Sequence, residues 1–314
     1  MSMRCNHVLW RLSRTVLSVC DAQEACLAHR LGHAPCLGLL PTGGQSRSLT
    51  VGLAQPQQRN QESQHNILHS VQDELKAVSE RIRVAVTSEI PALQQAASYF
   101  FLSGSEGKQI RPSICLLLSS ALADGSPPEE QVLTADLRPV GITPSEVRRR
   151  QQRIAEISEL IHVASLLHDD VIDDADARRG KPALNHVMGN KVAILAGDFL
   201  LARASMTLAS LQNTAVVSLM SQILEDLVSG EVLQATAAKA RLASMDLYTQ
   251  KTYLKTASLI ANACKATAVL SEANAEICEA SFQFGRNVGL AFQVRIDVAT
   301  VVMRYHEHTR DTVI

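Results

Sequence analysis

The acidic run Asp169-Asp170-Val-Ile-Asp173 places three carboxylates within five residues, as a metal-binding or catalytic site would require. The apolar run Ser165-Leu-Leu-His168 in front of it favours a helix, in which Asp169 and Asp173 are four residues apart on one face. These acids then lie near the C-terminal end of the helix, where the helix dipole disfavours negative charge. Hard cations such as Mg²⁺ take a few carboxylate oxygens and keep places for water and phosphate. The run therefore predicts a Mg²⁺ site, with a solvated acidic turn as the alternative.

A second set of residues could bind an anion. The run Gly107-Lys108-Gln-Ile-Arg111-Pro112 places two cations and a proline at the start of a predicted helix, and helix N-termini bind anions. His162 lies seven residues before Asp169, so a helix returns it to nearly the same face. Each feature is commonplace by itself, because basic helix starts and structural histidines are frequent. In combination with the acidic run they favour phosphate binding.

Further cations follow the same theme. Arg178, Arg179 and Lys181 come shortly after the acidic run. Lys255 precedes Thr256 in a segment rich in serine and alanine, and the pair could bind another phosphate. Taken alone, a lysine extended along the surface and a threonine facing the helix backbone are the stronger explanation of this pair.

The elements that position these residues are predicted to be helices. Apolar residues recur at threes and fours from Ile67 to Ile82. The run Thr143-Pro144-Ser145-Glu146 is typical of a capping box with proline at the first helical position, and it starts a long helix that reaches the acidic run. Period-two alternation is not sustained before residue 293. The pattern predicts an all-α fold, with further helices at 93–101, 112–123, 187–210, 214–234, 246–270 and 272–292.

Composition limits the possible function classes. The 314 residues are 46% hydrophobic and only 4% aromatic, which favours a sizeable helical core. The formal net charge of −1 gives no electrostatic reason to expect nucleic acid as a partner. No uninterrupted apolar stretch of about 18 residues occurs, so we expect no transmembrane segment. The 7 cysteines show no metal-ligand spacing and are expected to be reduced.

Residues 1–60 differ from the rest of the chain. They contain six arginines, no lysine, and only Asp21 and Glu24 as acids. Val8, Leu9, Leu12 and Val16 have helical spacing. This composition is typical of an organelle transit peptide, with a disordered leader as the alternative. We expect a mitochondrial location, with the plastid as the alternative.

The motifs together resemble the trans-isoprenyl diphosphate synthases, and most closely the long-chain polyprenyl synthases that make quinone side chains. The likeness spans residues 61–293 and implies an all-α, isoprenoid synthase-like helical bundle. The matching motifs, in chain order, are Gly107-Lys108-x-x-Arg111-Pro112, His162 through Asp173, Arg178-Arg179-Gly180-Lys181, Ala196-Gly197-Asp198, Gly230-Glu231-x-x-Gln234, Lys255-Thr256-Ala-Ser-Leu and Gly289-Leu-Ala-Phe292-Gln293.

The resemblance implies a role for each matching residue. Asp169 and Asp173 would bind Mg²⁺ that bridges to an allylic diphosphate, with Asp170 in support. The family condenses isopentenyl diphosphate with the carbocation formed from the allylic diphosphate, and members usually form dimers. The allylic diphosphate would contact Arg178, Lys255, Thr256 and Gln293, and isopentenyl diphosphate would contact Lys108, Arg111, His162 and Arg179.

The resemblance implies that the growing product descends alongside the helix before the acidic run. One turn back lie Ala164 and Ser165, which are both small. In the family, bulky aromatic residues at these places give short products, so the resemblance favours a long product. Close helix packing is an additional reason for small residues here.

The resemblance breaks after Gln293. The family has a second Asp-rich motif there, whereas this chain has Asp297 at one acidic place and Ile296 and Thr300 at the other two. Residues 294–314 are expected to be a non-family tail arising by truncation, with the C-terminal helices missing, and the run 298–302 is β-prone. Loss of this motif predicts weak binding of the remaining metal ions and leaves open whether the chain is active alone.

Two other function classes remain as alternatives. A non-catalytic regulatory subunit of a heteromeric prenyl synthase would account for the broken second motif. A class I terpene cyclase would need a metal motif whose nearest match, Glu225-Asp226-Leu-Val-Ser229, has Leu233 at the required acidic place. A cyclase would also have no use for an isopentenyl clamp, so this alternative is the weaker one.

Overall fold

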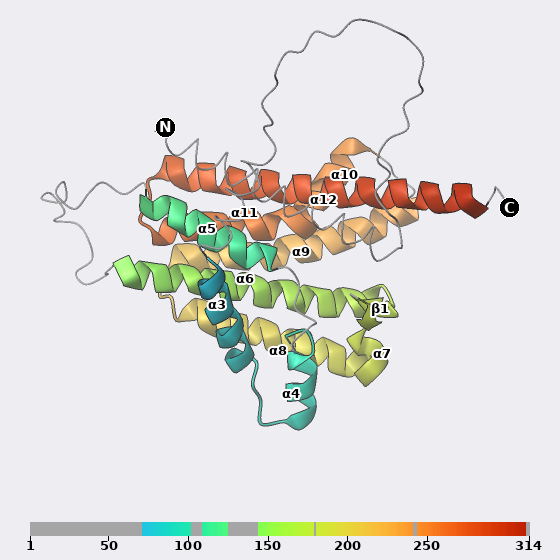
Figure 1. Cartoon of the computed structure of the whole chain (residues 1–314), viewed down its shortest axis with the longest axis horizontal. Coiled ribbons are helices and arrows are strands. Elements are labelled where there is room, and N and C mark those ends of the chain that lie inside the picture. Colours follow the sequence, from blue (N-terminus) through green and yellow to red (C-terminus); the bar gives the residue numbers. More distant parts are fainter. Residues whose placement is uncertain (1–70, 102–108, 125–143, 179, 241–243, 312–314) are drawn as a thin grey trace, which may run out of the picture.

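The computed structural model describes residues 71–101, 109–124, 144–178, 180–240 and 244–311. The predicted leader, Lys108 and Arg179 lie outside these residues. Almost all of the described chain is helical, so the predicted all-α fold class is confirmed (Figure 1). The helices are α3 (Gln72–Ala85), α4 (Pro91–Ser98), α5 (Ile110–Asp124), α6 (Pro144–Ile172), α7 (Leu184–Met188), α8 (Asn190–Ala209), α9 (Thr214–Ala240), α10 (Met245–Thr252), a π-helix (Tyr253–Ala257), α11 (Ser258–Leu270) and α12 (Ala275–Asp311).

Several predicted helices were right in type and wrong at their ends. The predicted helix 187–210 is divided into α7 and α8 by Gly189, whose φ of +84° interrupts a helix. The predicted helix 272–292 continues as α12 to Asp311. The β-prone run 298–302 is therefore helical, and that prediction was wrong. Strand propensity reflects packing on a pleated surface, and among the described residues the one sheet is a two-stranded hairpin elsewhere.

Helices α6 and α11 form the centre of the bundle (Figure 1). α6 packs against α5, α8 and α11, and its buried face includes Ile154, Ile157 and Leu167. α11 is buried along nearly all of its length and packs against α5, α6, α9 and α12. A Cβ at Gly285 of α12 would lie 2.7 Å from the carbonyl oxygen of Ile260, so glycine permits the close approach of α12 to α11.

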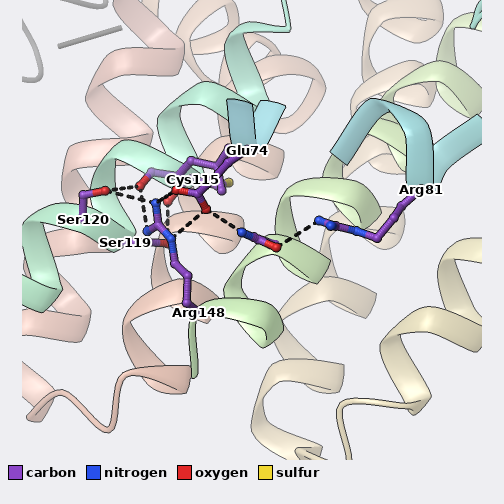
Figure 2. Close-up of polar contacts among 8 residues, drawn as sticks. Glu74, Arg81, Cys115, Ser119, Ser120 and Arg148 are labelled. Atoms are coloured by element: carbon purple, nitrogen blue, oxygen red, sulfur yellow. Dashed lines mark hydrogen bonds and ion pairs between the residues drawn. The ribbon is translucent and has the colours of Figure 1, made fainter. Parts of the chain in front are cut away.

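Helix α3 is held against the bundle by a polar network (Figure 2). The Arg148 guanidinium donates to both carboxylate oxygens of Glu74, at 2.9 Å and 2.6 Å, and to the carbonyl oxygen of Leu116 at 3.1 Å. Gln152 also donates to Glu74 and accepts from Arg81 at 3.1 Å. Burial alone would raise the pKa of Glu74, but hydrogen bonds from Arg148 and Gln152 and the positive charges of Arg148 and Arg81 hold it below its ordinary value. The network fixes α3 to α5 and α6.

Helix α8 is the one helix in the described ranges that is long and apolar enough to cross a membrane, judged by length and composition only. A core helix of a bundle passes the same test. α8 packs along α6, and a Cβ at Gly197 would overlap the imidazole of His168. We treat α8 as a bundle helix, and the expected lack of a transmembrane segment stays a prediction.

Candidate active site

The acidic run forms the C-terminal end of α6, as the sequence predicted. Asp169 and Asp170 lie in its last turn and Asp173 directly follows it. The backbone N–H of Asp173 donates to the carbonyl oxygen of Asp169 at 2.8 Å, and that of Ala175 to Asp170 at 2.9 Å. These bonds satisfy carbonyls at the helix end, while the Asp174 backbone takes a left-handed φ of +50° to turn the chain. The carboxylate groups of Asp169 and Asp173 are thus not consumed in capping the helix.

Asp170 connects the acidic run to the arginine that follows it. Strand β1 (Ala177–Arg178) pairs antiparallel with β2 (Lys181–Pro182), with Arg178 opposite Lys181. Arg178 donates from Nε to Asp170 Oδ1 at 2.8 Å, and its Nη2 contacts the same oxygen. Asp170 is 1% exposed, and its Oδ2 has no hydrogen-bond partner within the described residues. The buried carboxylate therefore orients the Arg178 guanidinium beside the acidic end.

The Asp169 carboxyl lies at the meeting point of several elements. Burial raises its pKa, and the negative charges of Glu231 on α9 and of Asp173 raise it further. The positive charges of Lys255 and Arg178 oppose this rise. The groups that act on Asp169 come from α6, α9, the hairpin and the π-helix. The predicted residues Asp169, Asp173, Arg178 and Lys255 are therefore brought together.

Lys255 and Thr256 lie in the π-helix between α10 and α11. Such wide turns in otherwise α-helical segments are frequent at functional sites. The Lys255 ammonium forms an ion pair with Glu231 and donates to Gln234 Oε1 at 3.3 Å. Thr256 Oγ1 donates to Gln293 Oε1 at 3.2 Å. The motif that contains Glu231 and Gln234 is part of the family resemblance, but no role was predicted for either residue from the sequence.

Asp297, the acid expected at the second metal motif, belongs to a chain of hydrogen bonds. Its Oδ1 accepts from Gln293 Nε2 at 3.0 Å, and its Oδ2 accepts from the Tyr248 hydroxyl at 2.7 Å. Burial and the Asp297 carboxylate raise the pKa of Tyr248. The amide of Gln293 is thereby fixed with its oxygen toward Thr256. Sequence analysis missed Tyr248, which sits 49 residues before Asp297 and carries no local signal.

The residues at the end of α6 fit a divalent cation. Two carboxylates on one helix face, a half-buried Asp169 with a raised pKa, and the orphaned buried oxygen of Asp170 leave negative charge that the neighbouring cations only partly match. Among the described residues, no group of three or more His, Cys, Asp or Glu side chains is placed to hold a metal ion together. Two carboxylates suit Mg²⁺, which binds through one or two carboxylates together with water and substrate phosphate.

The other predicted residues lie on α5 and α6. Arg111 is in the first turn of α5 and His162 is on α6, and both are half-buried. Ala164 is fully buried in the core, and Ser165 is half-buried with its hydroxyl donating to the carbonyl oxygen of His162 at 2.9 Å. Their assigned roles in isopentenyl diphosphate binding and chain length stay predictions.

Comparison with known proteins identifies the family. A model of the polyprenyl synthetase family matches residues 90–311. Solanesyl-diphosphate synthase 1, mitochondrial, of Oryza sativa subsp. japonica is 51% identical over 241 residues, which are 76% of this chain and 54% of that protein. Decaprenyl-diphosphate synthase subunit 1 of Schizosaccharomyces pombe is 39% identical over 74% of this chain and 64% of its own length.

A solved structure supports the same assignment. The polyprenyl synthase of Caulobacter crescentus complexed with calcium and isoprenyl diphosphate has a TM-score of 0.62 and 28% identity, covering 74% of this chain and 63% of that one. The chain spans about half the length of the rice relative, with 54% covered. Because the family model matches well over half of its residues, the chain belongs to the polyprenyl synthetase family.

Proposed function

We propose that this chain belongs to a transferase that condenses isopentenyl diphosphate with an allylic diphosphate to make a long-chain all-trans polyprenyl diphosphate. The observation that carries the proposal is the convergence of Asp169 and Asp173 with the cations of Arg178 and Lys255. Two carboxylates next to two cations suit a metal-bound diphosphate, since each charge on the ligand meets a group of opposite sign. The names of the relatives support a long product, and a quinone side chain as its destination is what the sequence resemblance implies.

Each residue near the bound diphosphate would have a separate role in the reaction. Mg²⁺ held by Asp169 and Asp173 would supply Lewis-acid stabilisation of the departing diphosphate. Lys255 and Arg178 add positive charge on the same side, and Asp170 keeps the Arg178 guanidinium in place. The isopentenyl double bond attacks the allylic carbocation, and the new cation then loses a proton. The carbocation would need an apolar surrounding that keeps water away from it.

The proposal extends to location and partners. The rice relative is named as mitochondrial, which supports a mitochondrial site of action for this chain, with the plastid as the alternative. The Schizosaccharomyces pombe relative is named as a subunit, which supports a dimer, either of two copies or with a second family member.

A second candidate function is a regulatory subunit without catalytic activity. Both carboxylate oxygens of Asp297 already accept hydrogen bonds, from Gln293 and Tyr248. Ile296 and Thr300 supply no carboxylate at the other two places of the expected motif. A partner chain with a complete second motif would then perform the reaction.

One assay separates the two candidates. Purified chain is incubated with Mg²⁺, labelled isopentenyl diphosphate and an allylic diphosphate, alone and with a full-length family member, and product length is read by chromatography. Mg²⁺-dependent incorporation by the chain alone, lost in Asp169→Asn, supports the catalyst. A change only in the partner's rate or product length supports the regulatory subunit. No effect in either arm would contradict both.

A further inference from the structure

The motif Gly230-Glu231-x-x-Gln234 on α9 has no role in the proposed reaction. All three of its named residues nevertheless lie against the side chain of Lys255. Glu231 forms an ion pair with the Lys255 ammonium, and Gln234 Oε1 accepts from it at 3.3 Å. A Cβ at Gly230 would lie 2.8 Å from Lys255 Cγ, so the lysine stem lies directly against the glycine. The spacing of one and four residues places these contacts on adjoining faces of one helix, which together form a seat for Lys255.

The seat is mostly shielded from water. The side chains of Lys255 and Glu231 are 21% and 20% exposed. An ion pair in such surroundings is screened less by solvent and salt than a surface pair. The backbone of Lys255 also lies close to Gly230, since a Cβ at that position would be 3.2 Å from the Lys255 backbone nitrogen. The lysine is therefore confined along its stem and at its charged end.

The number of N–H donors on the Lys255 ammonium determines how many contacts it can make beyond those with Glu231 and Gln234. A lysine ammonium has three N–H donors and no acceptor. Glu231 and Gln234 accept two of them, and within the described residues the third has no acceptor. Lys255 is also one of the charged groups that act on Asp169 at the end of α6.

We propose that Glu231 and Gln234 are positioning residues that hold the Lys255 ammonium so that its remaining N–H is presented to the diphosphate bound at Asp169 and Asp173. This inference rests on the proposed function, because it assumes that a diphosphate binds there. Fixing the lysine before binding avoids the loss of rotamer freedom that a flexible lysine would suffer on meeting the ligand. Neither positioning residue needs to touch the ligand.

The first test measures binding of inorganic diphosphate in the presence of Mg²⁺ by calorimetry. Gln234 is the better residue to change because its removal alters no charge. Gln234→Ala should weaken binding about fivefold and Lys255→Ala at least about tenfold, in keeping with one lost hydrogen bond and one lost charged contact. Gln234→Ala should have no further effect when Lys255→Ala is already present. Equal weakening in both backgrounds would overturn the inference, as would no effect in the unmodified background.

Matched controls separate positioning from general damage. Gln222 lies on the same helix, and its amide donates to Glu225 and Asp226 instead of contacting Lys255. Gln222→Ala should therefore leave diphosphate binding unchanged. Glu231→Gln removes a negative charge near Asp169 and should weaken Mg²⁺ binding without diphosphate by only about twofold. A loss of about a hundredfold or more, as expected for a missing carboxylate ligand, would make Glu231 a metal ligand and overturn the positioning role.

A second measurement needs no ligand and keeps the seat distinct from the proposed function. Lysine acylation followed by mass spectrometry reports how accessible each ammonium is. Lys255 should be labelled slowly in the unmodified chain and faster in Gln234→Ala and Glu231→Gln, whereas Gln222→Ala should not change it. Unchanged labelling of Lys255 would overturn the seat. A seat that passes this test in a chain that binds no diphosphate would instead overturn the proposed function and, with it, the role inferred for the seat.

Discussion

Helix α6 carries a cluster of charged side chains toward each of its ends, and the chain neutralises the two clusters differently. Toward the N-terminal end, Glu74 receives hydrogen bonds from Arg148 and Gln152 (Figure 2). Nearby, Glu156 pairs with Arg81 and Arg153. These acids from α3 and α6 meet guanidinium groups at close range. The cluster thus resembles a structural joint whose charges are matched within the protein.

At the C-terminal end the acids are not matched in the same way. Asp169 is influenced by Lys255 and Arg178, but those two cations are already engaged by Glu231 and Asp170. The pKa of Asp169 is accordingly raised, first by burial, whereas that of Glu74 is lowered by its partners in spite of burial. The acids toward the N-terminal end are thus matched by guanidinium groups, whereas Asp169 keeps negative charge that a cationic ligand could meet.

The largest effect is expected from removing both metal carboxylates. Asp169→Asn combined with Asp173→Asn should weaken Mg²⁺-dependent diphosphate binding by at least about a hundredfold, since even changes outside the first ligand shell cost ten- to hundredfold. Calorimetry with Mg²⁺ and inorganic diphosphate measures it. Asp174→Asn with Asp176→Asn makes the same change in net charge on two exposed neighbours and serves as the control. Equal losses in both double variants would show that bulk charge alone accounts for binding.

A change toward the N-terminal end of α6 should lower the stability of the fold without weakening diphosphate binding. Arg148→Ala leaves Glu74 and the Leu116 carbonyl without their donor and should lower the free energy of unfolding by about 2 kcal/mol, a figure reduced for partial exposure. Denaturant titration measures this. Arg149→Ala, in which an arginine of the same helix that is 70% exposed is removed, should cost much less. Loss of diphosphate binding in folded Arg148→Ala would contradict the separation of the two ends.

The middle of α6 offers a third test, because Ala164 lies between the two clusters. If the growing product descends along this part of the helix, Ala164→Phe should shorten the product of an active preparation, as read by chromatography. Ala164 is fully buried, so the larger side chain should also cost about 1–3 kcal/mol of stability. Ser165→Phe, at a half-buried position, provides a second variant if the first does not fold. Unchanged product length in both variants would contradict a path of the growing product along this face of α6.

The acidic end of α6 could be predicted from sequence because its pattern is local. A four-residue spacing on one helix face and an apolar run in front of it are both readable along the chain. The seat of Lys255 could not be predicted from sequence, because Glu231 and Lys255 are 24 positions apart and meet only when α9 packs on the π-helix. The prediction of strand structure for residues 298–302, which are helical, was wrong for a related reason: strand propensity depends on a neighbouring strand.

The smallest effects should appear in the pH dependence of stability, and their signs differ between the two ends. The folded-state pKa of Glu74 is lowered, so its contribution is present above the ordinary carboxyl value of about 4.3 and is lost as pH falls through the folded value. Glu74→Gln should therefore melt lower than the unmodified chain near neutral pH, and the difference should shrink in acid. Thermal melts from about pH 3 to 7 measure this.

Asp169 should behave in the opposite sense. Its raised pKa means that the folded state binds the proton more tightly than the unfolded state does, so in the absence of metal the ionised carboxyl lowers stability as pH rises above about 3.9. Asp169→Asn should therefore melt slightly higher than the unmodified chain at neutral pH without Mg²⁺, because it removes a buried charge and its repulsion by Glu231 and Asp173. Mg²⁺ should reverse the order by binding only the unmodified site. If Asp169→Asn and Glu74→Gln shifted the melting temperature with the same sign at neutral pH, the two ends of α6 would not differ as proposed.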